Sequence, residues 1–356
     1  VFFFIIFEAM IYVFMQGLQA MPGLAWILIL QLILGGLAIF YMDDVTVKWG
    51  FGSGVSLFIA AGVSWRIIAT AFQFINTQGK NCLLDFSNTA CAGKVLVMIQ
   101  SLISSPPDQI GFLSALAAIV TTALIFFLVV WAQSLKVEVP LSFGRLRGYG
   151  IKWPLSFFYA SVIPVILTAA LVANVQLFGG LFQTWQGHPT ILGNYENGRA
   201  ECNANGCGIG FWISSTNMVE LFIRTGEIIP RYLLQGLTNM LFFVLFSTIF
   251  AVFWVKTAGM DAKAQAHNIA ASGLQVSGFR QDERVLESIL ERYIMPLTVM
   301  GGIAIGLLAS IADLLGALVS GTAVLLVIMI MFQFYQNIAH QHAVDMNPAM
   351  RKFIGG

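Results

Sequence analysis

Eight long apolar runs divide the chain, and each has about the length that crosses a lipid bilayer. A spanning helix needs about 20 mostly apolar residues, within a range of about 17–25. The runs lack the alternation of apolar and polar residues that is typical of a barrel wall, so they predict helices. The predicted spans are residues 2–18, 24–42, 55–74, 110–133, 155–177, 232–255, 295–312 and 322–338. The pattern therefore predicts an all-α fold, a polytopic membrane helix bundle with eight transmembrane helices.

Composition supports the membrane interpretation. The 356 residues are 58% hydrophobic and 10% charged, whereas soluble globular domains are about 45–50% apolar and about 25% charged. The 18 Lys and Arg residues nearly balance the 17 Asp and Glu residues, so there is no basic footprint for a nucleic acid. The composition therefore excludes an ordinary soluble domain.

The distribution of Lys and Arg predicts the orientation. The loops after the second, fourth, sixth and eighth spans hold twelve of these residues, and the opposite loops hold five. Because positive charge is retained in the cytosol, the first span is predicted to run outward and the C-terminus to be cytosolic. Cys82 and Cys91 then share one external loop, and Cys202 and Cys207 share another. Oxidising surroundings favour a disulfide within each loop; the alternative is four free thiols.

Catalytic and cofactor motifs are missing from the sequence. It has neither the G-x-x-x-x-G-K loop that binds nucleotides nor a zinc-protease helix signature. The cysteines form no Cys-x-x-Cys pair of the kind found in zinc and iron–sulfur sites. We therefore expect no enzyme activity, no catalytic residue, no metal and no cofactor.

Polar residues within the apolar runs are few, and each is costly unless it faces water or a partner. The candidates for a functional role are Glu8, Arg66, Asn174 and Asp313. One interpretation places them beside a water-filled interior. The other is a secondary transporter that uses Glu8, Arg66 and Asp313 as an ion pathway. The residues alone leave both open.

Two of the runs begin alike. Small residues open the spans at Gly54 and Gly321, and both continue in apolar residues. Superposing the two glycines places Ile59 against Leu326. This indicates two related halves, as in membrane proteins with inverted repeats; close helix contacts are the alternative reason for small residues there.

Four stretches carry a resemblance to a known family. They are residues 31–64, with FYMDDVTVKWGFGSG; residues 139–177, with LSFGRLRGYGIKWPLSFF; residues 253–302, with KTAGMDAKAQAHNIAASGLQVSGFR; and residues 312–326, ADLLGALVSGTAVLL. In these stretches and their order the chain resembles SecY, the channel subunit of the Sec protein translocon, in its archaeal and eukaryotic form. The resemblance implies a non-enzymatic pore that translocates unfolded polypeptides and releases transmembrane segments through a lateral gate.

The family has ten helices, so the resemblance implies that the eight spans match helices three to ten. The first two helices and the plug are expected to be absent from this sequence. The implied organisation has a remainder of the N-terminal half with three spans, an external loop, a C-terminal half with five spans, and a cytosolic tail. These parts are residues 1–74, 75–109, 110–338 and 339–356, and the third contains cytosolic docking loops at 136–154 and 256–294.

The family pore is closed by a ring of aliphatic side chains, which excludes water and ions yet deforms around a passing chain. The resemblance implies that this chain contributes four ring positions, and that a polar cluster at the lateral gate includes Glu8 and Asn174. The ring positions are Val55, Ile59, Ile166 and Leu326. The resemblance also suggests that Pro164 loosens the gate helix by removing a hydrogen bond; a structural kink is the alternative.

Basic residues in the cytosolic loops match the ribosome-docking surface of the family. They are Arg145, Arg147, Lys152, Arg280 and Arg284; contacts to ribosomal RNA phosphates suit arginine. The implied partners are small subunits of the SecE and SecG/Sec-beta types, a translating ribosome, nascent secretory and membrane polypeptides, and the lipid bilayer. The resemblance favours an archaeal plasma membrane over the endoplasmic reticulum.

Overall fold

The structure is a computed structural model, and part of the chain is described in it. The described residues are 2–14, 18, 21, 23–49, 54–76, 80–82, 91–103, 108–143, 150–160, 162–186, 188, 190–196, 199–202, 207–227, 229–271, 274–276 and 283–346.

The chain forms two compact units, and each is discontinuous in sequence. Unit 1 comprises Val1–Trp65, Ala173–Phe211 and Ile330–Gly356, and unit 2 comprises Arg66–Val172 and Trp212–Met329. Three of the boundaries between the units fall within long helices, α3 (Gly54–Phe72), α6 (Ile163–Gln186) and α12 (Gly321–Met346), and the fourth falls within the short helix α7 (Ile209–Ile213). The division at residues 74 and 110 that the sequence suggests stays a prediction.

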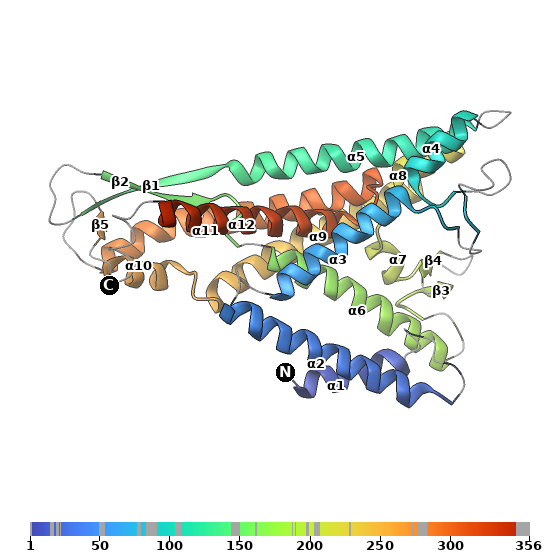
Figure 1. Ribbon diagram of the computed structural model, residues 1–356, viewed down its shortest axis with the longest axis horizontal. Coiled ribbons are helices and arrows are strands. Elements are labelled where there is room, and N and C mark those ends of the chain that lie inside the picture. The colour runs from blue at the N-terminus through green and yellow to red at the C-terminus, as the bar shows by residue number, and fades with distance from the viewer. Residues whose placement is uncertain are drawn as a thin grey trace. The chain divides into compact units, whose positions relative to one another are not determined.

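Long apolar helices dominate the described chain (Figure 1). Within it, seven helices are long and apolar enough to cross a membrane. Besides α3, α6 and α12 they are α2 (Ala25–Trp49), α5 (Gln109–Ser134), α9 (Pro230–Thr257) and α11 (Glu283–Leu315). The shorter helices are α1 (Phe2–Phe14), α4 (Lys94–Ile103), α7 (Ile209–Ile213), α8 (Met218–Thr225) and α10 (Ala262–Ala271).

Each predicted span coincides with a helix, but several boundaries differ from the prediction. The seventh span was predicted from residue 295, whereas α11 begins at Glu283, and α2, α6 and α12 each end seven to nine residues later than predicted. The first span is described only as α1, whose 13 residues are fewer than the roughly 17 needed to cross a bilayer. The fifth was predicted from residue 155, whereas α6 begins at Ile163. Leu155 instead lies in a β-strand and pairs with Val137. An apolar run of this length does not distinguish a strand followed by a helix from one longer helix.

Short strands add to the predicted helical fold outside the spans. In unit 2, β1 (Lys136–Phe143) lies between β2 (Gly150–Ser156) and β5 (Leu274–Val276), and both pairings are antiparallel. This sheet lies at the same end of unit 2 as α10 (Figure 1). In unit 1, β3 (Asn194–Glu196) and β4 (Arg199–Glu201) form a two-stranded ribbon.

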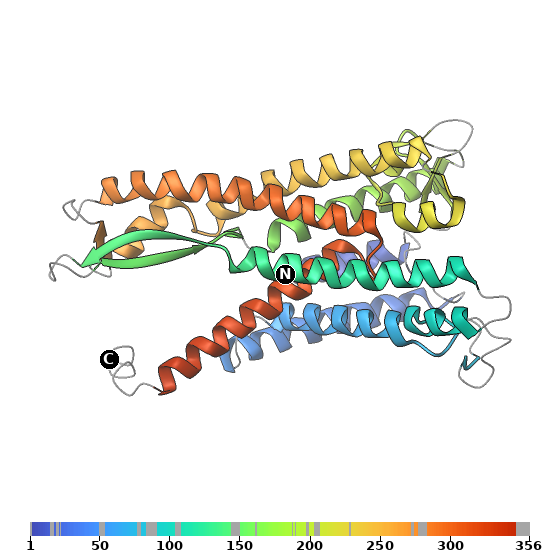
Figure 2. The same cartoon turned by 90° about the horizontal axis from the view of Figure 1, so that it is seen from above.

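The centre of unit 2 is the contact between α9 and α11, which lie side by side in Figures 1 and 2. Half of the apolar window of α11 is buried. Two glycines of α11 bring the helices together, because a Cβ atom on Gly302 would lie 2.9 Å from Thr248 Cα, and one on Gly306 would lie 2.9 Å from Val244 Cα. Small residues allow this close approach in membrane helices.

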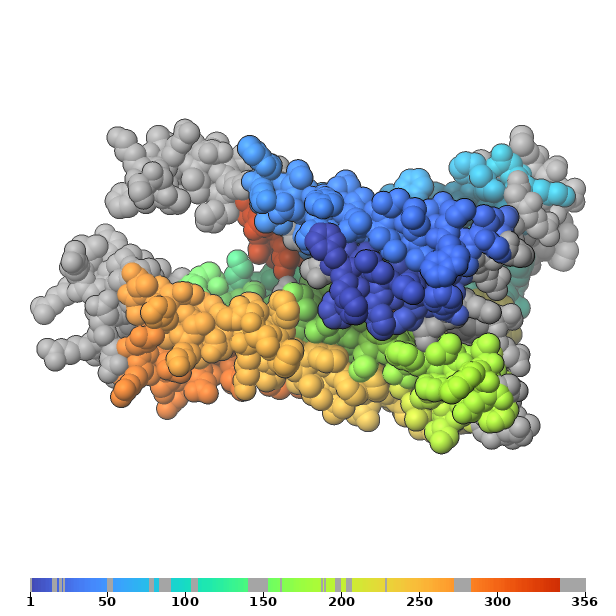
Figure 3. All heavy atoms as spheres, turned by 90° about the horizontal axis from the view of Figure 1, so that it is seen from below, coloured from blue at the N-terminus to red at the C-terminus, as the bar shows by residue number. Residues whose placement is uncertain are grey.

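The helices of unit 1 are more exposed. The space-filling view shows the open surface of α1 and α2 (Figure 3, blue), and much of their exposed area belongs to large apolar side chains. The two helices pack through a small cluster formed by Ala9, Val13 and Ile29. Because only 6% of the α2 window is buried within the chain, lipid or partner subunits must cover the remainder.

Candidate functional site

The four aliphatic residues assigned to the ring all lie near the start of a helix. Val55 and Ile59 are one and five residues beyond the start of α3, Ile166 is three beyond the start of α6, and Leu326 is five beyond the start of α12. The Val55 side chain is 40% exposed, and the other three are half-buried. Val55 and Ile59 are four residues apart, so they lie on one face of α3.

The start of α3 is attached to the end of α2. The Val55 amide donates a hydrogen bond of 2.9 Å to the Asp43 carboxylate, which belongs to α2. Gly54 is buried against the same residue, because a Cβ atom there would lie 3.0 Å from Asp43 Cα and would collide with the Thr46 side chain. The carboxylate therefore satisfies one of the amides that every helix start leaves without an intrahelical partner.

The start of α12 has the same arrangement. The Gly321 amide donates a hydrogen bond of 2.6 Å to the Asp313 carboxylate of α11. A Cβ atom on Gly321 would lie 2.6 Å from Ala312 Cβ and 3.0 Å from the Asp313 amide nitrogen. Asp313, which the transporter alternative places in an ion pathway, thus has a structural partner across the turn between two helices.

The start of α6 corrects the hypothesis about Pro164. This proline is the second residue of α6, where the backbone N–H has no intrahelical acceptor to lose. Its carbonyl accepts a hydrogen bond of 2.8 Å from the Thr168 hydroxyl. The prediction that Pro164 removes a hydrogen bond from the gate helix is therefore wrong, and the proline is compatible with a regular first turn.

The other three polar residues singled out in the sequence are exposed. Glu8 lies on α1, Asn174 on α6 and Arg66 on α3, and each has an exposed side chain. Glu8 and Asn174 both belong to unit 1. Exposure leaves each of these side chains accessible to water or to a partner molecule.

Three of the predicted docking residues, Arg145, Arg147 and Arg280, lie outside the described residues. The backbone of Lys152 lies in β2, opposite Pro140 of β1. Arg284 is exposed in the first turn of α11.

A buried apolar cluster holds the β1–β2 hairpin against the helices of unit 2. Its members come from both strands, the segment that follows them, and α9, α10 and α11; they include Val139, Leu155, Ala266 and Leu290. The Tyr159 hydroxyl adds a hydrogen bond of 2.6 Å to the Met260 carbonyl. Burial, and to a lesser extent the negative charge of Asp261, raises the pKa of Tyr159 to about 12, so the phenol remains a neutral donor. The cluster gives the hairpin a fixed base.

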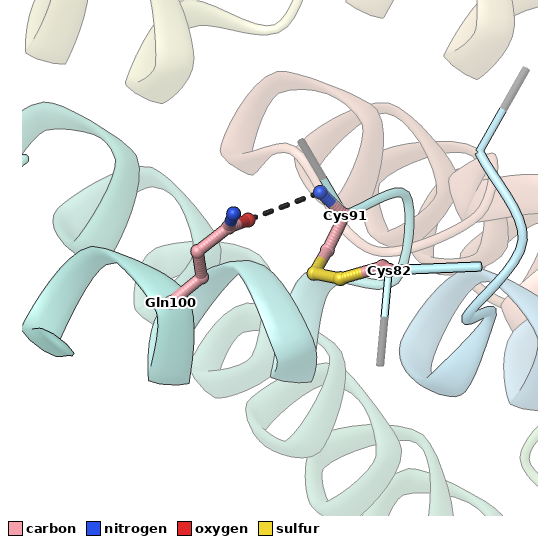
Figure 4. The surroundings of a disulfide bond; sticks show 3 residues. All are labelled: Cys82, Cys91 and Gln100. Carbon is pink, nitrogen blue, oxygen red and sulfur yellow. Dashed lines mark hydrogen bonds between the residues drawn. A yellow bond between two sulfur atoms is a disulfide. The ribbon is translucent and has the colours of Figure 1, made fainter. Parts of the chain in front are cut away.

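Both cysteine pairs form disulfides in the structure. Cys82 is joined to Cys91 in unit 2, and Cys202 to Cys207 in unit 1. Their Cα atoms are 5.3 Å and 4.5 Å apart, within the range of disulfide-bonded residues. Figure 4 shows the first pair, where the Cys91 amide donates to Gln100 Oε1 at 3.0 Å. This bond links the disulfide to α4.

Among the described residues, no group of three or more His, Cys, Asp or Glu could hold a metal ion. The functional contacts that sequence reasoning missed are those of Asp43 and Asp313 with the helices that follow them. A signal was present, because both aspartates precede the two matching span starts at Gly54 and Gly321.

Comparison with known proteins identifies the family. The SecY family model matches residues 1–335. The protein translocase subunit SecY of Methanothermobacter thermautotrophicus is 38% identical over 359 residues, which cover 99% of this chain and 73% of that protein.

Two solved structures agree with this relative, and each is 34% identical to the chain. The first is a SecY protein whose plug domain stabilises the closed state of the translocation channel. Its TM-score is 0.78, and the match covers 98% of this chain and 74% of that chain. The second is described as the structure of a protein conducting channel. Its TM-score is 0.77, and the match covers 98% of this chain and 73% of that chain.

The comparisons lend no support to the transporter alternative. A match over nearly the whole chain at this identity, together with the apolar helices, establishes what kind of protein this is. The chain belongs to the SecY family of multi-pass membrane proteins, which are channel subunits of protein translocases rather than catalysts.

Proposed function

We propose that four aliphatic side chains near the starts of α3, α6 and α12 form the constriction of a protein-conducting channel. They are Val55, Ile59, Ile166 and Leu326, and they are called the aliphatic ring below. An apolar constriction excludes water and therefore blocks ions, while branched side chains can move aside for an extended polypeptide. The proposal rests on membership of the SecY family, with each ring residue at the matching place in a family motif.

The positions of the ring residues are compatible with this role. All four are half-buried or exposed within this chain, so none of them is a fully buried core residue. They lie on three different apolar helices, as a ring around a pore requires. All four are aliphatic, so none carries a charge that would hold water in the constriction.

The experiment that tests the aliphatic ring measures ion leak through the idle channel. Ile59→Gly, Ile166→Gly and Leu326→Gly are introduced separately into the full-length channel complex, which is reconstituted into planar bilayers. Each should raise the conductance in the absence of a translocating chain, because a wider opening retains water.

Matched controls lie on the same helices. Leu57 is 45% exposed on α3 and Leu167 is 37% exposed on α6, and neither belongs to the ring. Leu57→Gly and Leu167→Gly remove the same kind of side chain and should leave the leak unchanged. If the ring variants leak no more than these controls, the proposed constriction is wrong.

We further propose that Glu8 and Asn174 contribute to the polar cluster of the lateral gate. Both side chains are exposed on helices of unit 1. Polar groups on the surface of a gate raise the hydrophobicity that a segment needs before it enters lipid. Replacing both by leucine should therefore let less hydrophobic segments insert, in an assay that scores membrane insertion against secretion of a graded series of segments.

We also propose a ribosome-docking surface built on the β1–β2 hairpin and the start of α11. The backbone position of Lys152 and the exposed side chain of Arg284 support it. The same surface is the proposed place for Arg145, Arg147 and Arg280. Small subunits of the SecE and SecG/Sec-beta types, nascent polypeptides and the lipid bilayer complete the proposed partners. The archaeal relatives favour an archaeal plasma membrane over the endoplasmic reticulum.

A further inference from the structure

Two aspartates hold the starts of two ring-bearing helices in the same way. Asp43 of α2 accepts a hydrogen bond from the Val55 amide of α3, and Asp313 of α11 accepts one from the Gly321 amide of α12. We propose that Asp43 and Asp313 are positioning residues, which set the position of the aliphatic ring along α3 and α12. This proposal rests on the proposed constriction.

Glycine makes each attachment close. Gly54 and Gly321 are buried, and a Cβ atom on either would lie 3.0 Å from a backbone atom of the aspartate that holds the helix. Both attachments therefore consist of a carboxylate hydrogen bond and a backbone contact to one residue. A helix start held by both cannot slide along its neighbour without losing the hydrogen bond or entering a steric clash.

Two of the ring residues lie at equal distances from the two buried glycines. Ile59 is five residues beyond Gly54, and Leu326 is five residues beyond Gly321. At 1.5 Å per residue, both lie about 7.5 Å further along their helices. Because the intervening turns are hydrogen-bonded helix, a shift of the helix start moves the ring side chain by the same amount. The likeness of the two span starts in the sequence thus corresponds to one repeated contact.

These attachments differ from an ordinary helix cap. Asp108 caps α5 by accepting a hydrogen bond from Gly111, three residues away in its own helix. That contact fixes the first turn of α5 only. Asp43 and Asp313 instead belong to the preceding helix, so each joins two helices. The carboxylate also suits the positive end of the helix dipole.

The test compares the loss of an attachment with the loss of an ordinary cap. Asp43→Ala and Asp313→Ala are introduced into the full-length channel complex, and the idle conductance is measured in planar bilayers. We expect an increase of about five- to tenfold for each, from the usual strength of a carboxylate cap. Asp43→Asn and Asp313→Asn retain an accepting oxygen and should restore the low conductance. Asp108→Ala loses a cap on a helix without a ring residue and should leave the conductance unchanged.

A combined variant separates positioning from general stability. If Asp43 acts through the ring residues of α3, then Asp43→Ala should add nothing to the leak of a chain that already carries both Val55→Gly and Ile59→Gly. Gly54→Ala retains the carboxylate but pushes the helix start away, so it should leak like Asp43→Ala. It covers the case in which the alanine variant does not assemble. Equal leak from Asp108→Ala, failure of the asparagine variants to restore closure, or additivity in the combined variant would each overturn the proposal. A silent Ile59→Gly would instead refute the aliphatic ring itself.

Discussion

Replacing Gly306 by alanine should separate α9 from α11 and destabilise unit 2. The added Cβ atom would lie 2.9 Å from both the Phe243 carbonyl oxygen and Val244 Cα, and closer still to Ser247 Oγ. Ordinary contact begins at 3.4 Å, and two of these three atoms belong to the backbone, which cannot rotate away. The helices must therefore move apart by about 0.5 Å.

The magnitude follows from three contributions. Overpacking of this kind costs about 1–3 kcal/mol. The Ser247 hydroxyl donates a hydrogen bond of 2.7 Å to the Gly302 carbonyl across the same contact, and lengthening it loses up to about 1 kcal/mol. Alanine regains about 1 kcal/mol through its higher helix propensity. The net destabilisation is about 2 kcal/mol, which lowers the melting temperature by about 4–8 °C.

The assay is thermal unfolding of the purified complex in detergent, followed by tryptophan fluorescence. Gly62→Ala is the matched control, because Gly62 lies within α3 and a Cβ atom there has no neighbour within 4 Å. It should be neutral or slightly stabilising. Adding Ser247→Ala to Gly306→Ala should recover less than half of the loss, since both backbone contacts remain. If Gly306→Ala and Gly62→Ala melt at the same temperature, the close contact of α9 with α11 is not as described.

Three further predictions concern the regions outside the spans. Tyr159→Phe should cost about 1–2 kcal/mol through its lost hydrogen bond. The pKa of Tyr159 is raised from 10.0 to about 12, so the stability that the neutral phenol contributes is complete below pH 10 and is lost as the pH rises towards 12. Melting curves of Tyr159→Phe should therefore lack the loss of stability that this group causes between pH 10 and pH 12. Cys91→Ser should lower the free energy of unfolding by about 2–3 kcal/mol. A reducing agent should destabilise the unmodified chain by breaking the Cys82–Cys91 disulfide, and this contribution should be missing in the variant. Arg284→Glu should weaken ribosome binding about tenfold in co-sedimentation at moderate salt. The control is Arg231→Glu, a charge reversal at an exposed residue outside both docking loops, which should change the binding little.

The spans could be predicted from sequence because lipid imposes a length and an apolar character on each helix by itself. The start of α6 was predicted wrongly because residues 155–162 are apolar enough to extend it. Whether Leu155 continues a helix or pairs with Val137 depends on a strand at some distance along the chain, and periodicity within the run carries no information about that partner.

The candidate site was predictable in its residue types but not in its contacts. The sequence places Asp313 in a span and identifies it as a charged residue that requires a polar partner. It does not reveal that this partner is the Gly321 amide, across the turn between α11 and α12. The Gly301-Gly302 pair was equally visible, but its meaning depends on Thr248, a residue of α9 some fifty positions earlier. Contacts between residues that are distant along the chain form only in the folded protein, and a single sequence does not show which residues will meet.

The contacts of the polar residues in the spans favour a channel over a solute carrier on physical grounds. Asp313 is bonded to a backbone amide at 2.6 Å, Ser247 to a backbone carbonyl at 2.7 Å, and Thr122 to the Leu318 amide at 2.9 Å. A carrier needs polar groups that can exchange these partners for an ion or solute. Here they join one helix or turn to the next, which fixes the apolar side chains beside them. A pore closed by aliphatic groups depends on this placement, because its seal is set by how closely the aliphatic side chains approach one another and not by charge.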